Sequence, residues 1–300
     1  MGSQPASRPR QTPGSLFAVA AVILWASNLI AARGIAEAVP PFTLSAIRWG
    51  TACLILFPFA GKDFLREWPR IRPHIRYYSL LSLLGMAVIS AAVYLAAHST
   101  EAVNMALINT TTPIFTLILA RVFLHETLSA ARCLGIVIVL AGVFLLLLKG
   151  DPRTLLDVRF HPGDLFMLIS ALSFAGYSIL LRRQPVELSD NGFHVTTFGI
   201  SFILLLPFAV LELFLGLRMT LSPASLGQIA YIVVAASVLC YWCWDKAVAL
   251  IGPARASLIY YSIPLFSGLG GLVFLDEPIS WVHFASCGLI LSGIFVALRK

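Results

Sequence analysis

The chain has 300 residues, of which 59% are hydrophobic and only 12% are charged, and its mean hydropathy is +0.89. Soluble domains carry about 25% charged residues, so the composition excludes an ordinary soluble domain. The net charge of +7 does not indicate a nucleic-acid partner. The basic residues lie in short segments between apolar runs and form no single patch.

Apolar runs of eighteen or more residues recur from end to end of the chain. Each run is long enough to cross a bilayer core of about 30 Å. Within lipid, only helices and closed barrels satisfy all backbone hydrogen-bonding groups. Barrel strands alternate polar and apolar residues over about ten positions, and these runs do not. The sequence therefore predicts an all-α polytopic membrane protein embedded in a lipid bilayer.

Residues 1–14 are polar and include Arg8, Arg10 and three prolines. We expect a disordered cytoplasmic tail there. The apolar run that follows continues to about Ile35 without the small-residue cleavage site of a signal peptide. It therefore predicts a retained first helix.

Ten apolar runs follow one another, separated by short polar or Pro- and Gly-containing segments. Val39-Pro40-Pro41 and Ile251-Gly252-Pro253 are typical of tight turns between antiparallel neighbours. No connection is long enough to separate soluble domains. The expected membrane spans are 15–35, 41–60, 75–98, 101–124, 128–148, 162–183, 191–216, 225–249, 252–275 and 279–298.

The positions of Lys and Arg orient these spans, because cytoplasmic loops of membrane proteins are enriched in basic residues. With the N-terminus inside, 15 of the 21 basic residues lie in inside segments and five lie outside, while Arg48 lies within the second span. This asymmetry predicts that both termini are cytoplasmic. It also explains the high pI without nucleic acid.

The two halves of the chain resemble each other. A shift of 151 residues aligns 101–149 with 252–300 without a gap, and 14 of the 49 pairs are identical. Pro113 falls on Pro264 in this alignment, and a shift of 149 relates earlier segments. Matches between apolar residues are expected by chance, but the matched Pro, Glu and Gly residues indicate an internal repeat.

The repeat defines three expected units after the tail: a first five-helix repeat at 15–148, an external linker at 149–161 and a second five-helix repeat at 162–300. Five spans are an odd number, so the second copy must enter the membrane from the opposite side. Inverted-topology repeats are typical of secondary transporters, whose binding site lies near the bilayer midplane between the halves. The repeat therefore favours a transporter.

The five-plus-five pattern resembles the drug/metabolite transporter superfamily, in its EamA-type branch. The resemblance covers essentially the whole chain after the tail, and it rests on the order and duplication of individually degenerate motifs. Segments 241–247 (YWCWDKA) and 252–257 (GPARAS) look most like its aromatic amino acid exporter group. It implies a bacterial inner-membrane exporter of a small molecule, with a central cavity. The remaining matching pieces are Trp25 with Asn28, Arg48, Pro113 to Glu126, and Pro264 to Glu277.

Pro113 and Pro264 lie near the centres of the fourth and ninth expected spans. A proline within a helix frees the carbonyl four residues earlier, here at Asn109 and Tyr260. We expect these two prolines to act as conformational kinks, with a simple packing kink as the alternative. Glu126 and Glu277 close the same spans, where helix-start electrostatics explain them without a transport role.

Larger polar and aromatic side chains recur at helical spacing within the spans. Because polar atoms that face lipid are costly, these side chains should face a cavity or a neighbouring helix. Helix packing is the alternative for each of them. The candidate substrate-cavity residues are Trp25, Asn28, Arg48, Tyr94, His98, Asn109, Tyr177, Tyr241, Trp244 and Tyr260.

Arg48 is the one ionisable residue clearly within a span, where a charge is by default functional. It can bind a substrate carboxylate, or it can snorkel toward the interface or pair structurally with Glu101 or with backbone carbonyls. Asp245 and Lys246 lie about a turn from the inner end of their span, where a solvated interfacial position is favoured over proton coupling. The aromatic residues expected to anchor span ends at the interface are Trp49, Trp68, Tyr77, Tyr78 and Trp281.

The sequence predicts no metal and no cofactor. Cys240 and Cys243 lie three residues apart, but without a nearby His or a second Cys pair they are better explained as small apolar filler. A membrane-embedded enzyme is the rival class, and the chain contains no G-x-S-x-G, H-E-x-x-H or Walker motif.

The favoured function is a secondary carrier that exports small organic solutes, most of all amino acids including aromatic ones, by alternating access. The alternative within the same superfamily is transport of a drug cation, a nucleotide sugar or another metabolite. The sequence leaves open the choice between proton coupling and facilitated diffusion, and the oligomeric state.

Overall fold

The structure is a computed structural model that describes residues 11–35, 38–100, 105, 108–127, 129–148, 150–151, 153, 161–266 and 281–298. The first ten residues of the expected tail, most of the expected linker at 149–161, and the segment that contains Glu277 lie outside this part of the chain. Glu101, a candidate partner of Arg48, also lies outside it.

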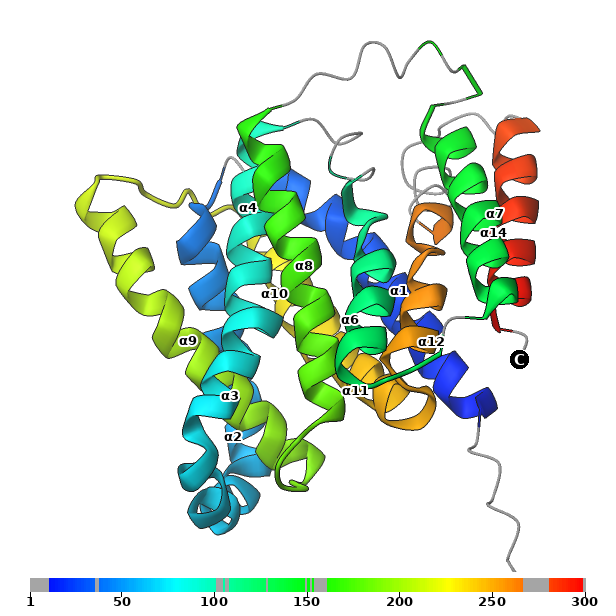
Figure 1. Cartoon of the computed structure of the whole chain (residues 1–300). Coiled ribbons are helices and arrows are strands. Elements are labelled where there is room, and N and C mark those ends of the chain that lie inside the picture. Colours follow the sequence, from blue (N-terminus) through cyan, green and yellow to red (C-terminus); the bar gives the residue numbers. More distant parts are fainter. Residues whose placement is uncertain are drawn as a thin grey trace, which may run out of the picture.

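Every regular element in the described part of the chain is helical (Figure 1). The helices of the first half are α1 (Gln11–Ile35), α2 (Pro41–Ile71), α3 (Ile75–Ser82), α4 (Val88–Ser99), α6 (Thr112–Phe123) and α7 (Ala130–Leu147). Those of the second half are α8 (Pro162–Arg182), α9 (Asp190–Phe214), α10 (Pro223–Val233), α11 (Cys240–Ile251), α12 (Pro253–Tyr260) and α14 (Trp281–Leu298). A short 3-10 turn, η1 (Arg72–His74), joins α2 to α3.

Six described helical stretches are long and apolar enough to span a bilayer. One of them, Pro41–Ser99, has 59 residues. A straight helix of that length would extend about 90 Å, three times the bilayer core, and the chain instead reverses direction between α2 and α3 (Figure 1). The expectation of ten spans remains a prediction. The six stretches are Pro41–Ser99, Ala130–Leu147, Pro162–Arg182, Asp190–Phe214, Pro223–Ile251 and Trp281–Leu298.

Two helices extend beyond their expected spans. Helix α1 begins at Gln11, four residues before the expected start, and α2 continues to Ile71, well past residue 60. Both extensions are polar, and helical geometry does not end where the hydrophobic run ends. Hydropathy marks the part of a helix that lies in lipid, so it underestimates helix length.

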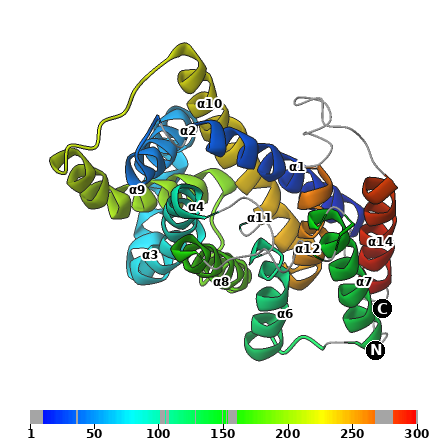
Figure 2. The same cartoon turned by 90° about the horizontal axis from the view of Figure 1, so that it is seen from above.

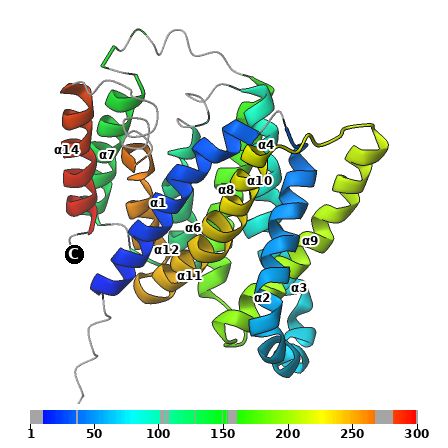
Figure 3. The ribbon, with the colours of Figure 1, turned by 180° about the vertical axis from the view of Figure 1, so that it is seen from behind.

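The pattern of helix contacts is similar in both halves: the main contacts between two helices recur between their repeat equivalents. Equivalent helices pair with each other: α2 packs on α9, α6 on α12, and α7 on α14. Helix α1 packs on α11, and its equivalent α8 packs on α4 in the same way. Figures 1 and 2 show α7 and α14 side by side at one edge, and Figure 3 shows α1 running beside α10 and α11. This reciprocal pattern is what two inverted copies of one helical repeat produce.

Glycines bring α7 and α14 into close contact. A Cβ atom at Gly135 would lie 2.5 Å from the carbonyl oxygen of Gly293, and one at Gly293 would lie 2.7 Å from that of Gly135. Small residues permit such backbone approach between membrane helices, which associate mainly by packing. Any larger side chain at these positions would force the pair apart.

Two glutamates connect α2 and α9 at opposite ends. Helix α2 starts after Pro40, which has no side-chain acceptor, and the Glu212 carboxylate from α9 accepts bonds from the backbone N–H groups of Phe42 (3.0 Å) and Thr43 (2.7 Å). At the other end, Glu67 of α2 accepts a bond from the backbone N–H of Ser189 (2.8 Å), the residue that precedes α9. Each helix thus supplies an acceptor for the free amide groups at the start of the other.

The first residue of α1 and the last residue of α14 lie at the same end of the molecule, the lower end in Figures 1 and 3. The connections from α2 to α3, α6 to α7, α8 to α9 and α11 to α12 lie at this end too (Figure 1). Residues 62–76, 121–132, 182–183 and 246–255, which surround these connections, contain 11 of the 21 basic residues. The asymmetry of charge in the sequence is therefore an asymmetry between the two ends of the fold.

We expect Glu212→Gln to lower the thermal stability of the protein in detergent. Glu212 is 6% exposed, and glutamine keeps only one acceptor oxygen and no charge, so one helix-start amide loses its partner. Loss of a helix cap costs about 1 kcal/mol, which corresponds to a melting temperature lower by a few degrees. Glu187→Gln, at an exposed loop position, is the matched control. Equal melting temperatures for the two variants would show that Glu212 does not stabilise the start of α2.

Candidate functional site

A π-helical turn interrupts the same span in each half. The turn η2 (Leu83–Ala87) joins α3 to α4, and η4 (Val234–Leu239) joins α10 to α11. Their starts are 151 residues apart, the shift that relates the two halves. A π turn changes the hydrogen-bond spacing from four residues to five, which leaves a carbonyl without its helical partner. Such turns often mark functional sites in helices.

Side chains from the opposite half bind a carbonyl oxygen in each π turn. The Tyr241 hydroxyl donates to the Gly85 carbonyl (2.6 Å), and Arg48 Nη2 donates to the Ala236 carbonyl (2.8 Å). Gly85 and Ala236 are themselves 151 residues apart. The two halves therefore satisfy each other's backbone at the centre of the fold, as a low-dielectric environment requires.

Protein groups bind Arg48 through three of its nitrogens. In addition to the Ala236 carbonyl, Nε donates to Ser237 Oγ (2.6 Å) and Nη1 to the Tyr94 hydroxyl (3.2 Å). The residue is 5% exposed, and its guanidinium lies 4.8 Å from the centre of the Trp49 ring. This placement favours the structural alternative, pairing with a backbone carbonyl, over contact with a substrate.

Two of the expected interfacial anchors are buried instead. Trp49 and Tyr78 are 0% exposed, and Trp49 Nε1 donates to Ser90 Oγ (3.1 Å). Position near the end of a hydrophobic run does not distinguish an interfacial ring from one that packs between helices. Trp68 and Trp281 are exposed, at 40% and 67%.

Five aromatic rings from both halves meet at the centre of the bundle, and we call them the aromatic cluster. Trp25 from α1 is its hub, with ring centroids 5.1 Å from Phe174, 5.3 Å from Trp244, 5.6 Å from Tyr241 and 5.8 Å from Tyr260. Most of these pairs are edge-to-face or tilted, which are favourable arrangements for aromatic rings. Phe174 is the repeat equivalent of Trp25, and this equivalence was the signal that could have added it to the candidate residues.

Two polar atoms at this centre lack partners within the part of the chain that the structure describes. Asn28 Oδ1, three residues after Trp25 on the same face of α1, is a buried acceptor, and Trp244 Nε1 is a buried donor. Asn28 is 6% exposed and Trp244 is 0% exposed. Buried polar groups without partners are rare and call for an explanation such as a ligand or water.

The fourth span is broken rather than kinked, and the ninth follows the same pattern. Residues 110–111 form a turn, and Pro113 lies in the first turn of α6. Residues 261–262 form a turn after α12, and residues 263–266, with Pro264, are helical again. Each proline therefore lies beside a helix break, and its role as a conformational kink stays a prediction. A proline without an N–H group fits the start of a helix, where that donor has no partner in any case.

Asn109 and Tyr260 lie at these two breaks and touch each other. The Tyr260 hydroxyl donates to Asn109 Oδ1 (3.2 Å), although the residues are repeat equivalents 151 positions apart. Equivalent residues of an inverted repeat can meet only near the axis that relates the halves. The breaks, the aromatic cluster and this axis therefore coincide.

Tyr94 and His98 lie beside this centre rather than in it. Tyr94 binds Arg48 and packs with Leu44, Ile35 and Ile232. His98, near the end of α4, is exposed, and its Nδ1 lies 2.7 Å from the Tyr94 carbonyl oxygen. The sequence placed both residues on one polar stripe, and both lie in the second half of α4, outside the aromatic cluster.

Tyr177 connects the aromatic cluster to a buried carboxylate. Its ring lies 6.2 Å from Phe174 and 6.0 Å from Tyr241, and its hydroxyl donates to Asp245 Oδ1 (2.5 Å). The other oxygen of Asp245 lies 3.1 Å from His194 Nε2, and the two side chains are 12% and 6% exposed. The expectation of a solvated, interfacial Asp245 is wrong, because α8 and α9 cover it. His194 was not among the candidates.

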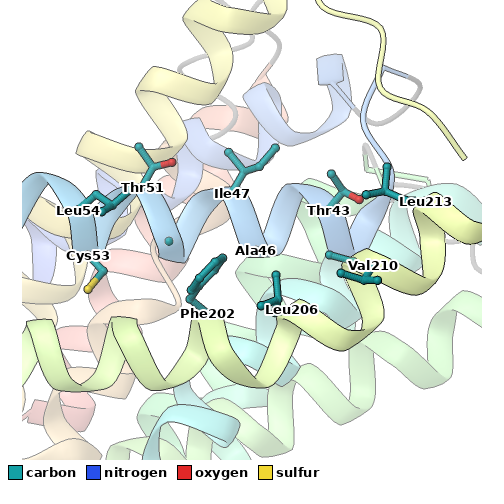
Figure 4. A pocket seen from close by; sticks show the side chains of 12 residues that line it. Thr43, Ala46, Ile47, Thr51, Cys53, Leu54, Phe202, Leu206, Val210 and Leu213 are labelled. Carbon is teal, nitrogen blue, oxygen red and sulfur yellow. The ribbon is translucent and has the colours of Figure 1, made fainter.

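A groove of about 420 Å³ lies between α2 and α9 (Figure 4). Its lining is almost entirely apolar and includes Leu54 and Leu213, which are 73% and 61% exposed. Phe202 and Leu206 from α9 face α2 across it (Figure 4). A groove with this lining on an outer flank is surface that faces lipid, and it is separate from the aromatic cluster.

The position of Cys240 is that of a small apolar residue that fills space between helices. Cys240 is buried, and its thiol donates to the Ala21 carbonyl (3.2 Å). Within the described residues, no group of three or more His, Cys, Asp or Glu side chains is arranged to hold a metal ion.

We expect Gly85→Ala to destabilise the protein. An added Cβ would lie 2.2 Å from Tyr177 Cδ2, so a fully buried ring must move together with its bond to Asp245. Overpacking of this kind costs about 1–3 kcal/mol, measured as a lower melting temperature in detergent. The control is Gly227→Ala in α10, where nothing lies within 4 Å and the change should be neutral or stabilising. If both variants melt at the same temperature, Gly85 is not required for the close approach of Tyr177.

Comparisons with known proteins agree with the two-fold architecture. The family model of the EamA-like transporter family matches this chain twice, at residues 12–148 and 161–299. The two matches begin 149 residues apart and end 151 apart, the same two shifts that the sequence contains.

The chain is also similar to two curated proteins and one solved structure. It is 26% identical over 263 residues to the uncharacterized transporter YyaM of Bacillus subtilis, covering 86% of this chain and 84% of that protein. It is 26% identical over 299 residues to the uncharacterized inner membrane transporter YedA of Escherichia coli K12, covering 96% and 90%. One crystal structure has the same fold, with a TM-score of 0.74 at 19% identity over 96% of this chain and 97% of that one.

Proposed function

We propose that this chain, which belongs to the EamA-like transporter family, is a secondary carrier that exports small organic solutes by alternating access. Amino acids, including aromatic ones, are the substrates that we assign to it. The aromatic cluster, with its two unpartnered polar atoms, is the observation that carries this proposal.

The aromatic cluster has the position that a carrier site requires. Helix α1 belongs to the first half, and α8, α11 and α12 belong to the second, so the cluster spans the interface between the halves. The Asn109–Tyr260 bond lies beside it, at the axis between the repeats. In carriers built from inverted repeats, the substrate site lies at this interface.

The polar atoms of the centre match the two charged ends of an amino acid. Asn28 Oδ1 accepts a hydrogen bond, as an ammonium group requires, and Trp244 Nε1 donates one, as a carboxylate requires. The surrounding rings can pack against an aromatic or aliphatic side chain and attract the ammonium group. A nucleotide sugar would need several groups for its phosphates. A drug cation would have no use for the Trp244 donor.

The broken helices supply the freedom that alternating access needs. Helix α6 begins beside Asn109, and α12 ends at Tyr260, so both breaks lie at the proposed substrate site. Breaks of this kind allow the parts of a span on either side of the site to move separately. An enzyme would instead need a nucleophile, a metal or an acid–base pair aimed into the cavity. The described residues around the aromatic cluster supply rings, hydroxyls and amides, and the Asp245–His194 pair contacts the cluster through Tyr177.

We expect Trp244→Phe to weaken substrate binding without loss of folded protein. Phenylalanine keeps an aromatic ring but removes the Nε1 donor, so KM should rise about tenfold, the lower end of the range for a hydrogen bond to a charged group. The measurement is exchange of labelled amino acids in liposomes that contain the purified protein. Trp281→Phe, at an exposed ring, is the matched control and should transport normally. An unchanged KM in Trp244→Phe would exclude this donor from the site.

We also propose a bacterial inner-membrane location with both termini cytoplasmic. The basic residues gather at the end of the fold where α1 begins and α14 ends, and cytoplasmic loops are enriched in such residues. An alkaline phosphatase fusion to the C-terminus should therefore be inactive, and a fluorescent protein fusion should be bright. The reverse pattern would invert the orientation.

A further inference from the structure

We propose that Asp245 and His194 together hold the proton that couples this carrier to a pH gradient, an inference that rests on the proposed transport function. We call these two side chains the buried pair. Asp245 comes from α11 and His194 from α9, and both lie within membrane-spanning helices. Ionisable groups in such positions are costly and by default functional.

The tautomer of His194 is fixed by its surroundings. Its Nδ1 lies 2.6 Å from the Asp190 carbonyl oxygen, and a carbonyl can only accept a hydrogen bond. Nδ1 must therefore carry a hydrogen. In a neutral imidazole ring the other nitrogen, Nε2, then has a lone pair and no hydrogen.

That tautomer makes the contact with Asp245 depend on one more proton. Nε2 lies 3.1 Å from Asp245 Oδ2, at ion-pair distance but without the alignment of a good hydrogen bond. With a neutral ring and an ionised carboxylate, two lone pairs would face each other. The contact is attractive only when a proton is held on the ring or on the carboxylate. The described conformation is therefore the proton-loaded one.

Loss of this proton would leave a buried carboxylate facing a lone pair. The Tyr177 hydroxyl still donates to Oδ1, but it carries no charge. Nearby Lys246 pairs with Asp190 at 2.7 Å, in a bridge whose side chains are 36% and 46% exposed. A buried, uncompensated charge is strongly unfavourable, so proton release should separate α9 from α11 and admit water.

Other titratable or charged groups lie near the buried pair. Proton coupling by the pair requires that none of these groups binds the coupling proton in its place. Helix α1 contributes none among its described side chains. The groups on the elements around α11 are Arg48 from α2, Tyr77 from α3, Tyr177 and Arg182 from α8, Asp190 from α9, Arg255 and Tyr260 from α12, and Cys240, Tyr241, Cys243 and Lys246 on α11 itself. When the elements packed against α9 are included, the other described carboxylates near the pair are Asp190, which is paired with Lys246, and Glu67 of α2, which binds the Ser189 amide.

Tyr177 gives the proton and the substrate a common neighbour. Its hydroxyl binds Asp245, while its ring packs against Phe174 and Tyr241 of the aromatic cluster. Trp244 precedes Asp245 on α11. A substrate that moves these rings must change the contacts of Asp245, and two sites that share a movable element are coupled in both directions.

The buried pair lies toward the end of the fold that we assign to the cytoplasm. His194 is four residues from the start of α9, which is about one helical turn. A proton on the pair closes α9 against α11 at this end. Its release to the cytoplasm opens that contact, and a substrate can enter from the same side. Export of substrate is then linked to entry of a proton.

The decisive variant is Asp245→Asn, which keeps the volume of the side chain and removes its charge. An asparagine amide can donate to the lone pair of His194 Nε2, so the variant imitates the proton-loaded pair at every pH. In liposomes, the unmodified protein should accumulate labelled amino acid on the acidic side of a pH gradient. Asp245→Asn should lose this accumulation. Asp190→Asn breaks the exposed bridge between the same two helices and should retain it.

A second measurement keeps the proposal open to refutation if transport is lost for another reason. As pH is raised, the melting temperature of the unmodified protein in detergent should fall, because the pair stabilises the fold only while it holds the proton. Asp245→Asn should have the flatter profile, and Asp190→Asn should keep the original slope. An unchanged slope or unchanged accumulation in Asp245→Asn would overturn the proposal.

Transport by the unmodified protein distinguishes failure of proton coupling from failure of the carrier function. Exchange of amino acids without any response to a pH gradient would overturn proton coupling and leave the carrier function intact. If no amino acid is exchanged at equal pH, the proposed function fails, and the coupling fails with it. The pH profile of melting would then still decide whether the buried pair binds a proton.

Discussion

Lipid offers no hydrogen bonds, and this constraint organises the centre of the protein. A π turn in each half changes the backbone hydrogen-bond spacing around one carbonyl, that of Gly85 and that of Ala236. Each carbonyl is bound by a side chain from the other half, Tyr241 or Arg48. Each half therefore supplies a hydrogen-bond donor to the backbone of the other, which stabilises the two halves against each other.

The same reciprocity limits where the protein can move. Helices α2 and α9 are tied at one end by Glu212 and at the other by Glu67, and their middles pack along the groove of Figure 4. This pair is therefore suited to act as a fixed frame. The breaks beside Asn109 and Tyr260 lie in other helices, and among the described residues a single neutral hydrogen bond joins these two positions. Motion between the halves should concentrate at these breaks.

The sequence predicted the repeated architecture well, because composition and periodicity are local properties. Matched residues such as Pro113 and Pro264 identified equivalent helices before their positions were known. Local patterns do not determine which helices become neighbours, so they could not show that α1 packs on α11. For the same reason, Trp49 was assigned to the interface and Asp245 to solvent. Depth within a bundle depends on the helices that cover a residue, and these come from distant parts of the chain.

The Asn109–Tyr260 bond has a consequence for the orientation of a bound molecule. Two equivalent positions meet at the axis, yet they carry an amide and a phenol, and nearby Trp25 corresponds to Phe174. Identical residues would have offered a bound molecule the same surroundings in either of two orientations. Unlike residues remove that equivalence, so the ends of a molecule meet different groups. Such unequal surroundings favour one of the two head-to-tail orientations of a bound molecule, so duplication followed by divergence is enough to orient a substrate at the axis.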